Sequence, residues 1–242
     1  MHDPPTEAST RPDRRRLASA LRDLASHQST VDQTLQAAVD LCRDLIHGCD
    51  IADIMLLQRR HITTPVSSDP RATPLGRAQQ ETGEGPCLTA ALQETVVVTQ
   101  DLRKDPRWPR FAARALEQGV VAVLSYQLFL NRSDGDRFGA LNIYGTSPNA
   151  FDDEAIELGE VFAAHCAATL AAAIEQEGAR AALQSRDVIG QAKGILMERH
   201  RLSADHAFRL LQRTSQQHNI KLRDLAEHVT TTGELPNRPP HL

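Results

Sequence analysis

The C-terminal part of the chain shows three apolar stripes at helical spacing. The first consists of Val188, Ile189, Ala192, Ile195 and Leu196. The second consists of Ala207, Leu210, Leu211 and Thr214, and the third of Leu222, Leu225, Ala226 and Val229. Ser203 is a favoured helix N-cap before the second stripe, and Gly233 followed by Pro236 ends the third. The pattern predicts a bundle of three short helices over residues 185–235.

The polar face of the first predicted helix carries basic residues, no acid and an exposed glycine. Arg186, Gly190, Lys193 and Met197 lie opposite its apolar stripe. A glycine inside a helix costs about 1 kcal/mol relative to alanine, so Gly190 and its neighbour Gly194 indicate that another molecule approaches the backbone. On the second and third helices, the basic candidates for the same surface are Arg209, Arg213 and Lys221.

This segment resembles the ANTAR domain, an RNA-binding output module of bacterial transcription antiterminators. The residues that carry the resemblance are Arg186, Val188, Ile189, the run Ala192–Met197, Ala207, Phe208, Leu211, Ser215, Asn219 and the run Lys221–Ala226. Ser215 stands where many members have alanine. The resemblance implies binding to tandem short RNA hairpins in messenger leaders, which keeps a terminator from forming. The RNA-binding candidates are Arg186, Gly190, Lys193, Gly194, Arg209, Arg213 and Lys221.

The N-terminal part alternates helix and strand signals. Residues 17–25 and 31–45 read as helices, and residues 51–57, 96–98, 120–130 and 139–144 as strands bounded by turns. Residues 133–136 read as a hairpin loop, and Asp152 as the N-cap of the next helix. Antiparallel strands with flanking helices predict an α+β sandwich rather than a wound parallel sheet.

Three stretches of this part resemble a GAF domain of the type found before actinobacterial ANTAR domains. They are Gly83–Leu88, Asp101–Leu102 with Asp105–Phe111, and Phe138–Tyr144. The resemblance implies a sensor domain with a small-molecule ligand, of unidentified chemistry, in a pocket over the sheet. Cys87, Arg107 and Trp108 are the ligand-pocket candidates. A helix start at Cys87 would lower the pKa of its thiol; the alternatives are a buried small hydrophobe for Cys87 and a core role for Trp108.

These segments predict a disordered tail over residues 1–16, a sensor domain over 17–177, the RNA-binding domain over 185–235 and a tail over 236–242. A helical connector over 152–184 overlaps the end of the sensor domain, because no proline occurs from Asp152 to Met197. One heptad column in it is apolar throughout and predicts a coiled-coil homodimer: Ala167, Ile174, Ala181 and Val188. The alternative is a single helix that caps the sheet, with a joint near Gly178.

The net charge changes sign between the predicted sensor domain and the predicted RNA-binding domain. Residues 17–182 hold 14 Lys and Arg against 22 Asp and Glu, whereas residues 183–235 hold 8 against 6. The excess of two basic residues is small for a nucleic-acid-binding domain, so the placement of the basic residues on one surface has to matter more than their number.

Other classes of protein find little support in the chain. No paired-carboxylate spacing, nucleophile elbow, phosphate-binding loop or zinc-protease motif occurs, which predicts no catalytic residue and no enzyme. Four scattered cysteines, Cys42, Cys49, Cys87 and Cys166, predict reduced thiols in a cytoplasmic protein without a metal site. No apolar run approaches 18 residues and no secretory signal opens the chain, so we expect no membrane contact.

Two other functions remain open at this point. Three short helices with a basic face also suit a DNA-binding regulator, although Asp224 and Glu227 make the third helix acidic in its middle. A sensor that acts through protein contacts alone is the other alternative.

Overall fold

A computed structural model describes residues 10–26, 30–58, 61–129 and 137–236. The chain divides into two compact units, Met1–Ile174 and Glu175–Leu242. Each unit has its own core, and the boundary lies inside one long helix.

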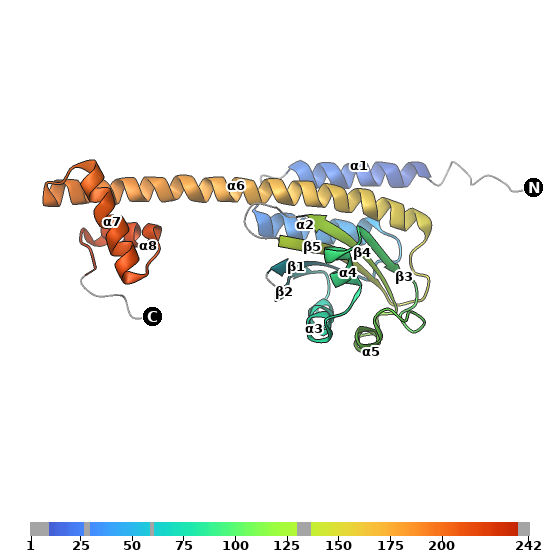
Figure 1. Ribbon diagram of the computed structural model, residues 1–242. Helices are drawn as coiled ribbons and strands as arrows, with labels where there is room; N and C mark the ends of the chain where they lie inside the picture. The colour runs from blue at the N-terminus through green and yellow to red at the C-terminus, as the bar shows by residue number, and fades with distance from the viewer. Residues whose placement is uncertain (1–9, 27–29, 59–60, 130–136, 237–242) are drawn as a thin grey trace, which may run out of the picture. The chain divides into compact units, whose positions relative to one another are not determined.

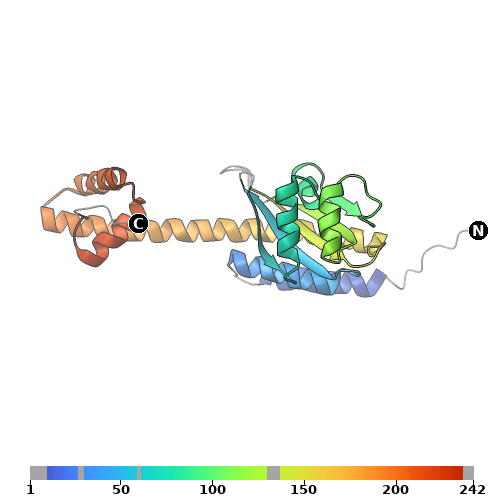
Figure 2. The same cartoon turned by 90° about the horizontal axis from the view of Figure 1, so that it is seen from below.

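The N-terminal unit is an antiparallel sheet covered by helices on both faces (Figures 1 and 2). Its strands are β1 (Ile51–Gln58), β2 (His61–Ser67), β3 (Val96–Thr99), β4 (Ala122–Phe129) and β5 (Arg137–Gly145), in the order β2-β1-β5-β4-β3. Its helices are α1 (Thr10–Ser26), α2 (Val31–Leu45), α3 (Ala72–Thr82), α4 (Pro86–Leu92), α5 (Pro109–Glu117) and the first part of α6 (Asp153–His200). The predicted α+β fold with an antiparallel sheet is confirmed.

The two faces of the sheet make two separate cores because side chains alternate along each strand. On β1, Ala52 and Ile54 pack against α1, α2 and α6, together with Phe162 and Leu170 of α6. Ile51, Met55 and Leu57 of the same strand pack against α3, α4 and α5. We call these the α2–α6 core and the α3–α5 core.

β2, α3 and α5 were not predicted from the sequence, and α4 was considered only as a helix start at Cys87. β2 contains Pro65 and lies at an edge of the sheet, where a residue without a backbone N–H is tolerated. The four predicted strands are all present, and β1 pairs in register with β5 along its whole length.

The predicted disordered tail over 1–16 is wrong at its end, because α1 begins at Thr10. Ala20 and Leu24 of this helix are buried in the α2–α6 core, which explains why it is ordered. Residues 1–9, the predicted hairpin loop over 133–136 and residues 237–242 lie outside the described residues.

The C-terminal unit is the predicted three-helix bundle, built from the end of α6, α7 (Ala204–His218) and α8 (Leu222–Thr232). Its core consists of Ala192, Leu196, Ala207, Leu211, Leu225, Ala226 and Val229. The Ser203 hydroxyl accepts a hydrogen bond from the His206 backbone N–H, as an N-cap does. Asn219 and Gly233 end α7 and α8 in the left-handed conformation.

Most residues of the heptad column predicted to form a coiled coil pack against other parts of the same chain, so they are not available to a second copy. Ala167 and Ile174 are half-buried against the α2–α6 core, and Val188 packs against the core of the C-terminal unit. Only Ala181 of that column is exposed. The expectation of a continuous exposed seam is therefore wrong, because the apolar periodicity is used within the chain.

By length and composition alone, α6 is apolar enough to cross a membrane. Core helices of proteins without membrane spans pass the same test. Phe162, Cys166 and Leu170 are buried in the α2–α6 core, so the apolar character of this segment has a structural reason inside the N-terminal unit.

Candidate nucleic-acid interface and ligand site

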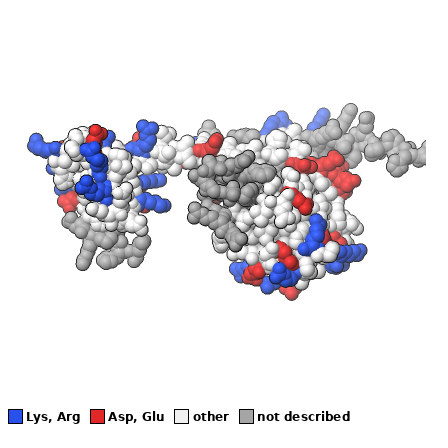
Figure 3. Space-filling view, viewed as in Figure 1, with Lys and Arg blue, Asp and Glu red and all other residues white. Residues whose placement is uncertain are grey.

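The basic side chains proposed for RNA binding are available on the surface of the C-terminal unit. Arg186, Arg209, Arg213 and Lys221 are exposed. Within the described part of the chain, neither these four residues nor Lys193 form an ion pair or a side-chain hydrogen bond. We call these five the free basic residues. Figure 3 shows Lys and Arg side chains outnumbering Asp and Glu on the visible face of this unit.

Two other arginines of the unit are occupied by structural contacts. The Arg199 guanidinium donates to the Gly233 carbonyl and pairs with Glu234 at 3.2 Å, which ties the end of α8 to α6. Arg223 pairs with Glu227 one turn along α8, at 2.9 Å. The free basic residues are therefore distinguished from these arginines by the absence of an acidic partner in the described residues.

Packing gives no reason for Gly190 and Gly194. A Cβ built at either position meets no atom within 4 Å. By contrast, a Cβ at Gly159 of the same helix would lie 2.3 Å from the Tyr126 hydroxyl oxygen, so that glycine is required by packing. Both Gly190 and Gly194 are exposed, and they leave a stretch of helix backbone without side chains on the outer face of the bundle.

Lys193 and Met197 are less exposed than the sequence indicated. Both are half-buried, and Met197 packs against the core of the C-terminal unit. Met197 therefore has a structural role, which answers why an apolar residue lies outside the main stripe. A half-buried lysine keeps its aliphatic stem on the protein and its ammonium group in water.

A row of polar side chains crosses the α3–α5 face of the sheet. Asp53 on β1, Asn142 on β5 and Ser125 on β4 are paired in register and fully buried. The Asp53 carboxylate accepts from Asn142 Nδ2 at 2.6 Å and from the Tyr144 hydroxyl at 3.0 Å. Burial without a cationic partner raises the pKa of Asp53 from 3.8 to about 7, although both hydrogen bonds lower it.

Two atoms beside this row are buried without a hydrogen-bond partner among the described residues. They are Gln79 Nε2, a donor, and Asn142 Oδ1, an acceptor. Unsatisfied buried polar atoms are rare in native structures and call for a partner such as water or a ligand. This cluster was not predicted from the sequence, although Asp53 and Asn142 interrupt otherwise apolar strands and could have indicated it.

Cys87 lies at the centre of the same cluster. It occupies the first turn of α4, as predicted, with its sulfur 3.5 Å from the Tyr144 hydroxyl and 3.6 Å from that of Ser125. A helix start alone would lower the pKa of this thiol, but burial raises it to about 12. The alternative of a buried small side chain describes Cys87 better.

The glycine-rich stretch before Cys87 joins three helices. Gln79 Oε1 of α3 accepts from the Cys87 backbone N–H at 3.0 Å and so caps α4. Gly85, with φ of 145°, permits this contact, because a Cβ there would lie 2.2 Å from Gln79 Oε1. Glu84 accepts from the Arg110 and Phe111 backbone N–H groups and caps α5. The motif therefore fixes the helices that cover the polar row.

Arg107 and Trp108 hold the segment before α5 in place. Trp108 is 5% exposed in the α3–α5 core, and its Nε1 donates to the Thr89 hydroxyl at 3.2 Å. The Arg107 guanidinium stacks over the Trp108 ring, 4.2 Å from its centroid, and pairs with Asp105 at 2.7 Å. The structure brings Cys87 and Trp108 into one core and leaves Arg107 at the surface.

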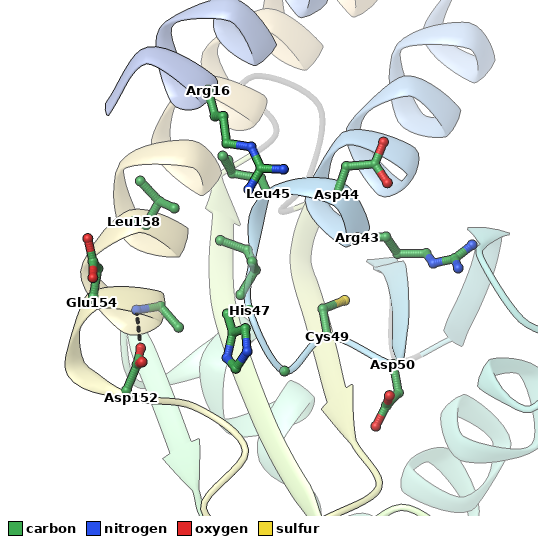
Figure 4. Close-up of a pocket in the computed structure, with 13 residues that line it drawn as sticks. Arg16, Arg43, Asp44, Leu45, His47, Cys49, Asp50, Asp152, Glu154 and Leu158 are labelled. Carbon is green, nitrogen blue, oxygen red and sulfur yellow. Dashed lines mark hydrogen bonds between the residues drawn. The ribbon is translucent and has the colours of Figure 1, made fainter. Parts of the chain in front are cut away.

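Two surface pockets lie elsewhere on the N-terminal unit. One, of about 530 Å³, lies between α1, the end of α2 and the start of α6, and its lining includes Arg16, His47, Cys49 and Glu154 (Figure 4). The other, of about 500 Å³, lies beside the loop from Gln100 to Pro106. Cys87, Arg107 and Trp108 line neither. No group of three or more metal-ligating side chains occurs within the described ranges.

Comparisons with known proteins agree with this division of the chain. Residues 28–171 match the family model of the GAF domain, and residues 177–229 match that of the ANTAR domain. No functionally curated protein matches the chain in sequence.

Solved structures share the fold at low sequence identity. A free methionine-R-sulfoxide reductase from Neisseria meningitidis is 16% identical over 73% of this chain and 98% of its own, with a TM-score of 0.50. The GAF domain of an Acinetobacter phosphoenolpyruvate-protein phosphotransferase is 16% identical over 69% and 96%, with a TM-score of 0.51. A bacteriophytochrome from R. palustris is 14% identical over 80% and 44%, with a TM-score of 0.55. Such identities support the fold alone.

The GAF match spans more than half of the chain, and the ANTAR match covers the helical bundle with the free basic residues. GAF domains are sensors and ANTAR domains are RNA-binding modules of antiterminators, so the two units have regulatory roles. The chain therefore belongs to the GAF family and, with an ANTAR domain following its GAF domain, it is a GAF–ANTAR regulator.

Proposed function

We propose that this protein is a ligand-responsive regulator that binds tandem RNA hairpins in messenger leaders and prevents transcription termination. The observation that carries the proposal is the outer face of the ANTAR domain. This domain exposes basic side chains that have no acidic partner in the described residues, and it exposes two glycines that packing does not require.

This face suits RNA hairpin loops for a physical reason. Bases in a loop are unstacked and readable, whereas the deep major groove of an A-form stem excludes side chains. Gly190 and Gly194 let a base or phosphate approach the backbone of α6, and Arg209 and Arg213 supply positive charge on α7. A DNA-binding function is less favoured, because Arg223 on α8 is neutralised by Glu227 and leaves that helix with little free positive charge.

The ligand of the GAF domain is proposed to lie on the α3–α5 face of the sheet. The unpaired buried atoms Gln79 Nε2 and Asn142 Oδ1 support this position, because a bound polar group would supply the missing acceptor and donor. We propose a regulatory rather than a catalytic use of this site, in keeping with the two domains.

Replacing both Gly190 and Gly194 with alanine is expected to separate stability from RNA binding. Each added Cβ meets no protein atom, so the helix gains about 0.5–1 kcal/mol per alanine. The same Cβ atoms obstruct an RNA that approaches the backbone, and hairpin affinity is expected to fall about tenfold or more. Thermal unfolding and a filter-binding titration measure the two effects.

Gly178→Ala is the matched control. Gly178 also lies in α6 with no atom within 4 Å of its built Cβ, but it precedes the bundle. This variant should gain helix stability and keep wild-type RNA affinity. Unchanged affinity in the Gly190→Ala, Gly194→Ala variant would contradict backbone approach by RNA.

We also propose a homodimer through the outer face of α6. The residues from Glu175 to Gln184 are all exposed, and Leu183, which is 60% exposed, is an apolar side chain that a second copy could bury. Leu183→Asp is expected to convert the dimer to a monomer in light scattering. Gln184→Asp, on an adjacent position of the same helix, should leave the mass unchanged. Equal masses for wild type and Leu183→Asp would rule out this interface.

A further inference from the structure

Each of the three helices of the C-terminal unit is followed by a residue with left-handed backbone, and one of these residues is an arginine. Asn219 follows α7 with φ of 52°, and Gly233 follows α8 with φ of 75°. Glycine and asparagine are the two residue types that this conformation favours. Arg201 follows α6 with φ of 53°. A side chain with a β-carbon is strained there, so folding alone favours glycine or asparagine at position 201.

Contacts on both sides of Arg201 hold the short turn between α6 and α7 (Figure 1). The Leu202 N–H donates to the Met197 carbonyl at 3.2 Å, which closes the end of α6 around Arg201. The Leu202 side chain packs against the core of the unit. The Ser203 hydroxyl then caps α7 by accepting from the His206 N–H at 3.4 Å. The backbone at Arg201 is therefore fixed in the left-handed conformation.

No contact among the described residues explains why this position holds an arginine. Arg201 is exposed, and within residues 137–236 and the other described ranges its guanidinium forms neither an ion pair nor a hydrogen bond. Glu198 and Asp205, the acidic residues nearest to it in sequence, do not pair with it. Arg199, two residues earlier, instead ties the end of α8 to α6. A strained backbone position that carries an unpaired cation indicates a functional use of the side chain.

We propose that Arg201 is a further RNA-contacting residue, which binds a backbone phosphate of the hairpin. The inference rests on the proposed RNA-binding function and extends it to the turn between α6 and α7. A guanidinium keeps its charge at physiological pH and donates N–H groups to phosphate oxygens. The turn leads directly into α7, whose exposed Arg209 and Arg213 are candidates for the same backbone. Because the turn is fixed, less conformational freedom is lost when the side chain binds.

Arg201→Gly tests the contact, because folding and RNA binding predict opposite effects at this position. Glycine relieves the strained backbone, so the unfolding temperature of the full chain, followed by circular dichroism, should not fall below that of the wild type. The RNA probe is a tandem hairpin selected against the wild-type chain from a pool with randomised loops. Its affinity should fall about five- to tenfold near physiological salt. The slope of log affinity against log salt should decrease by about 0.7–0.9, the value for one phosphate.

Asn219→Gly is the matched control for the change of backbone. Asn219 has the same conformation at the end of α7, where the Ile220 N–H donates to the Ser215 carbonyl at 3.0 Å. This variant should keep the wild-type affinity and salt slope. Arg201→Lys keeps the positive charge and should keep the wild-type slope, with affinity within about threefold of the wild type. If Arg201→Gly fails to fold, Arg201→Asn makes the same test with the residue type that ends α7.

The salt slope decides between the outcomes. A wild-type slope in Arg201→Gly would overturn the phosphate contact, whether or not the affinity falls. Equal losses in Arg201→Gly and Asn219→Gly would also overturn it, because the effect would then belong to the helix ends and not to the arginine. Both results leave RNA binding by the wild-type protein intact. They differ from failure of the proposed function, in which the wild-type chain selects no hairpin and the Arg201 contact is refuted with it.

Discussion

Asp53→Asn is expected to remove most of the pH dependence of the stability of the GAF domain between pH 4 and 7. Burial favours the neutral carboxyl, so the pKa of Asp53 rises from 3.8 to about 7 on folding. Between these values the folded state holds a proton that the unfolded state has released, and the free energy of unfolding falls as pH rises. It is lowest above about pH 7, and the difference amounts to about 4 kcal/mol at most.

Asparagine can replace Asp53 in this site, and its side chain does not titrate. Its carbonyl oxygen still accepts from Asn142 Nδ2, and its amide group donates to the Tyr144 hydroxyl in place of accepting from it. At pH 8 we expect the variant to be more stable than the wild type by about 2 kcal/mol or more. Urea unfolding followed by Trp108 fluorescence reports on this domain, because Trp108 is the single tryptophan and lies in the α3–α5 core.

Asp69→Asn is the matched control. Asp69 pairs with Arg71 at 2.9 Å, and these hydrogen bonds lower the pKa of Asp69 to about 2. A lowered pKa contributes stability that is fully present above the ordinary value of 3.8 and is lost only as pH falls toward 2, so the control keeps the wild-type slope between pH 5 and 7. If Asp53→Asn kept that slope as well, Asp53 would not be the buried group that titrates there.

Lys193→Ala is expected to weaken hairpin binding by about 5- to 150-fold, which corresponds to about 1–3 kcal/mol for one specific contact. Lys193 belongs to the free basic residues and directly precedes Gly194, where the backbone is open. Arg209→Ala should have a smaller effect that decreases as salt rises, as a phosphate contact does. Fluorescence anisotropy with a labelled hairpin measures both.

Arg180→Ala controls for loss of charge alone. Arg180 is an exposed arginine of the same helix, 13 residues before Lys193, or about 20 Å at 1.5 Å per residue. Its loss should change hairpin affinity less than twofold. If Arg180→Ala and Lys193→Ala weakened binding equally, the effect would be one of total charge and not of a defined site.

The helical bundle was predictable because local signals determine it. The 3.6-residue period located the stripes of α7 and α8, and Ser203 and Gly233 marked helix ends that the structure has at the same places. α8 begins at Leu222, the first residue of the third apolar stripe, and ends at Thr232, directly before Gly233. The first helix of the bundle was recognised too, although it is the end of α6.

The features that depend on tertiary packing were not predictable in the same way. The periodicity of α6 indicates an apolar column but does not show which surface that column packs against. In the structure, Ala167 and Ile174 pack against the α2–α6 core of the same chain. The local environment of Cys87 at a helix start suggested a low pKa, but burial has the larger effect. Register pairing across β1, β5 and β4 brings Asp53, Asn142 and Ser125 together, and no sequence spacing reveals that row.

The central claim is that the ANTAR domain of this protein recognises RNA hairpins. The most direct measurement compares binding of the full chain to a tandem RNA hairpin, selected from a pool with randomised loops, with binding to duplex DNA of the same sequence. We expect the hairpin to bind at least about 100-fold more tightly at physiological salt, with affinity lost when the loop bases are replaced. Equal or tighter binding to duplex DNA, or no selectable hairpin at all, would contradict the claim and favour DNA binding or action through protein contacts, respectively.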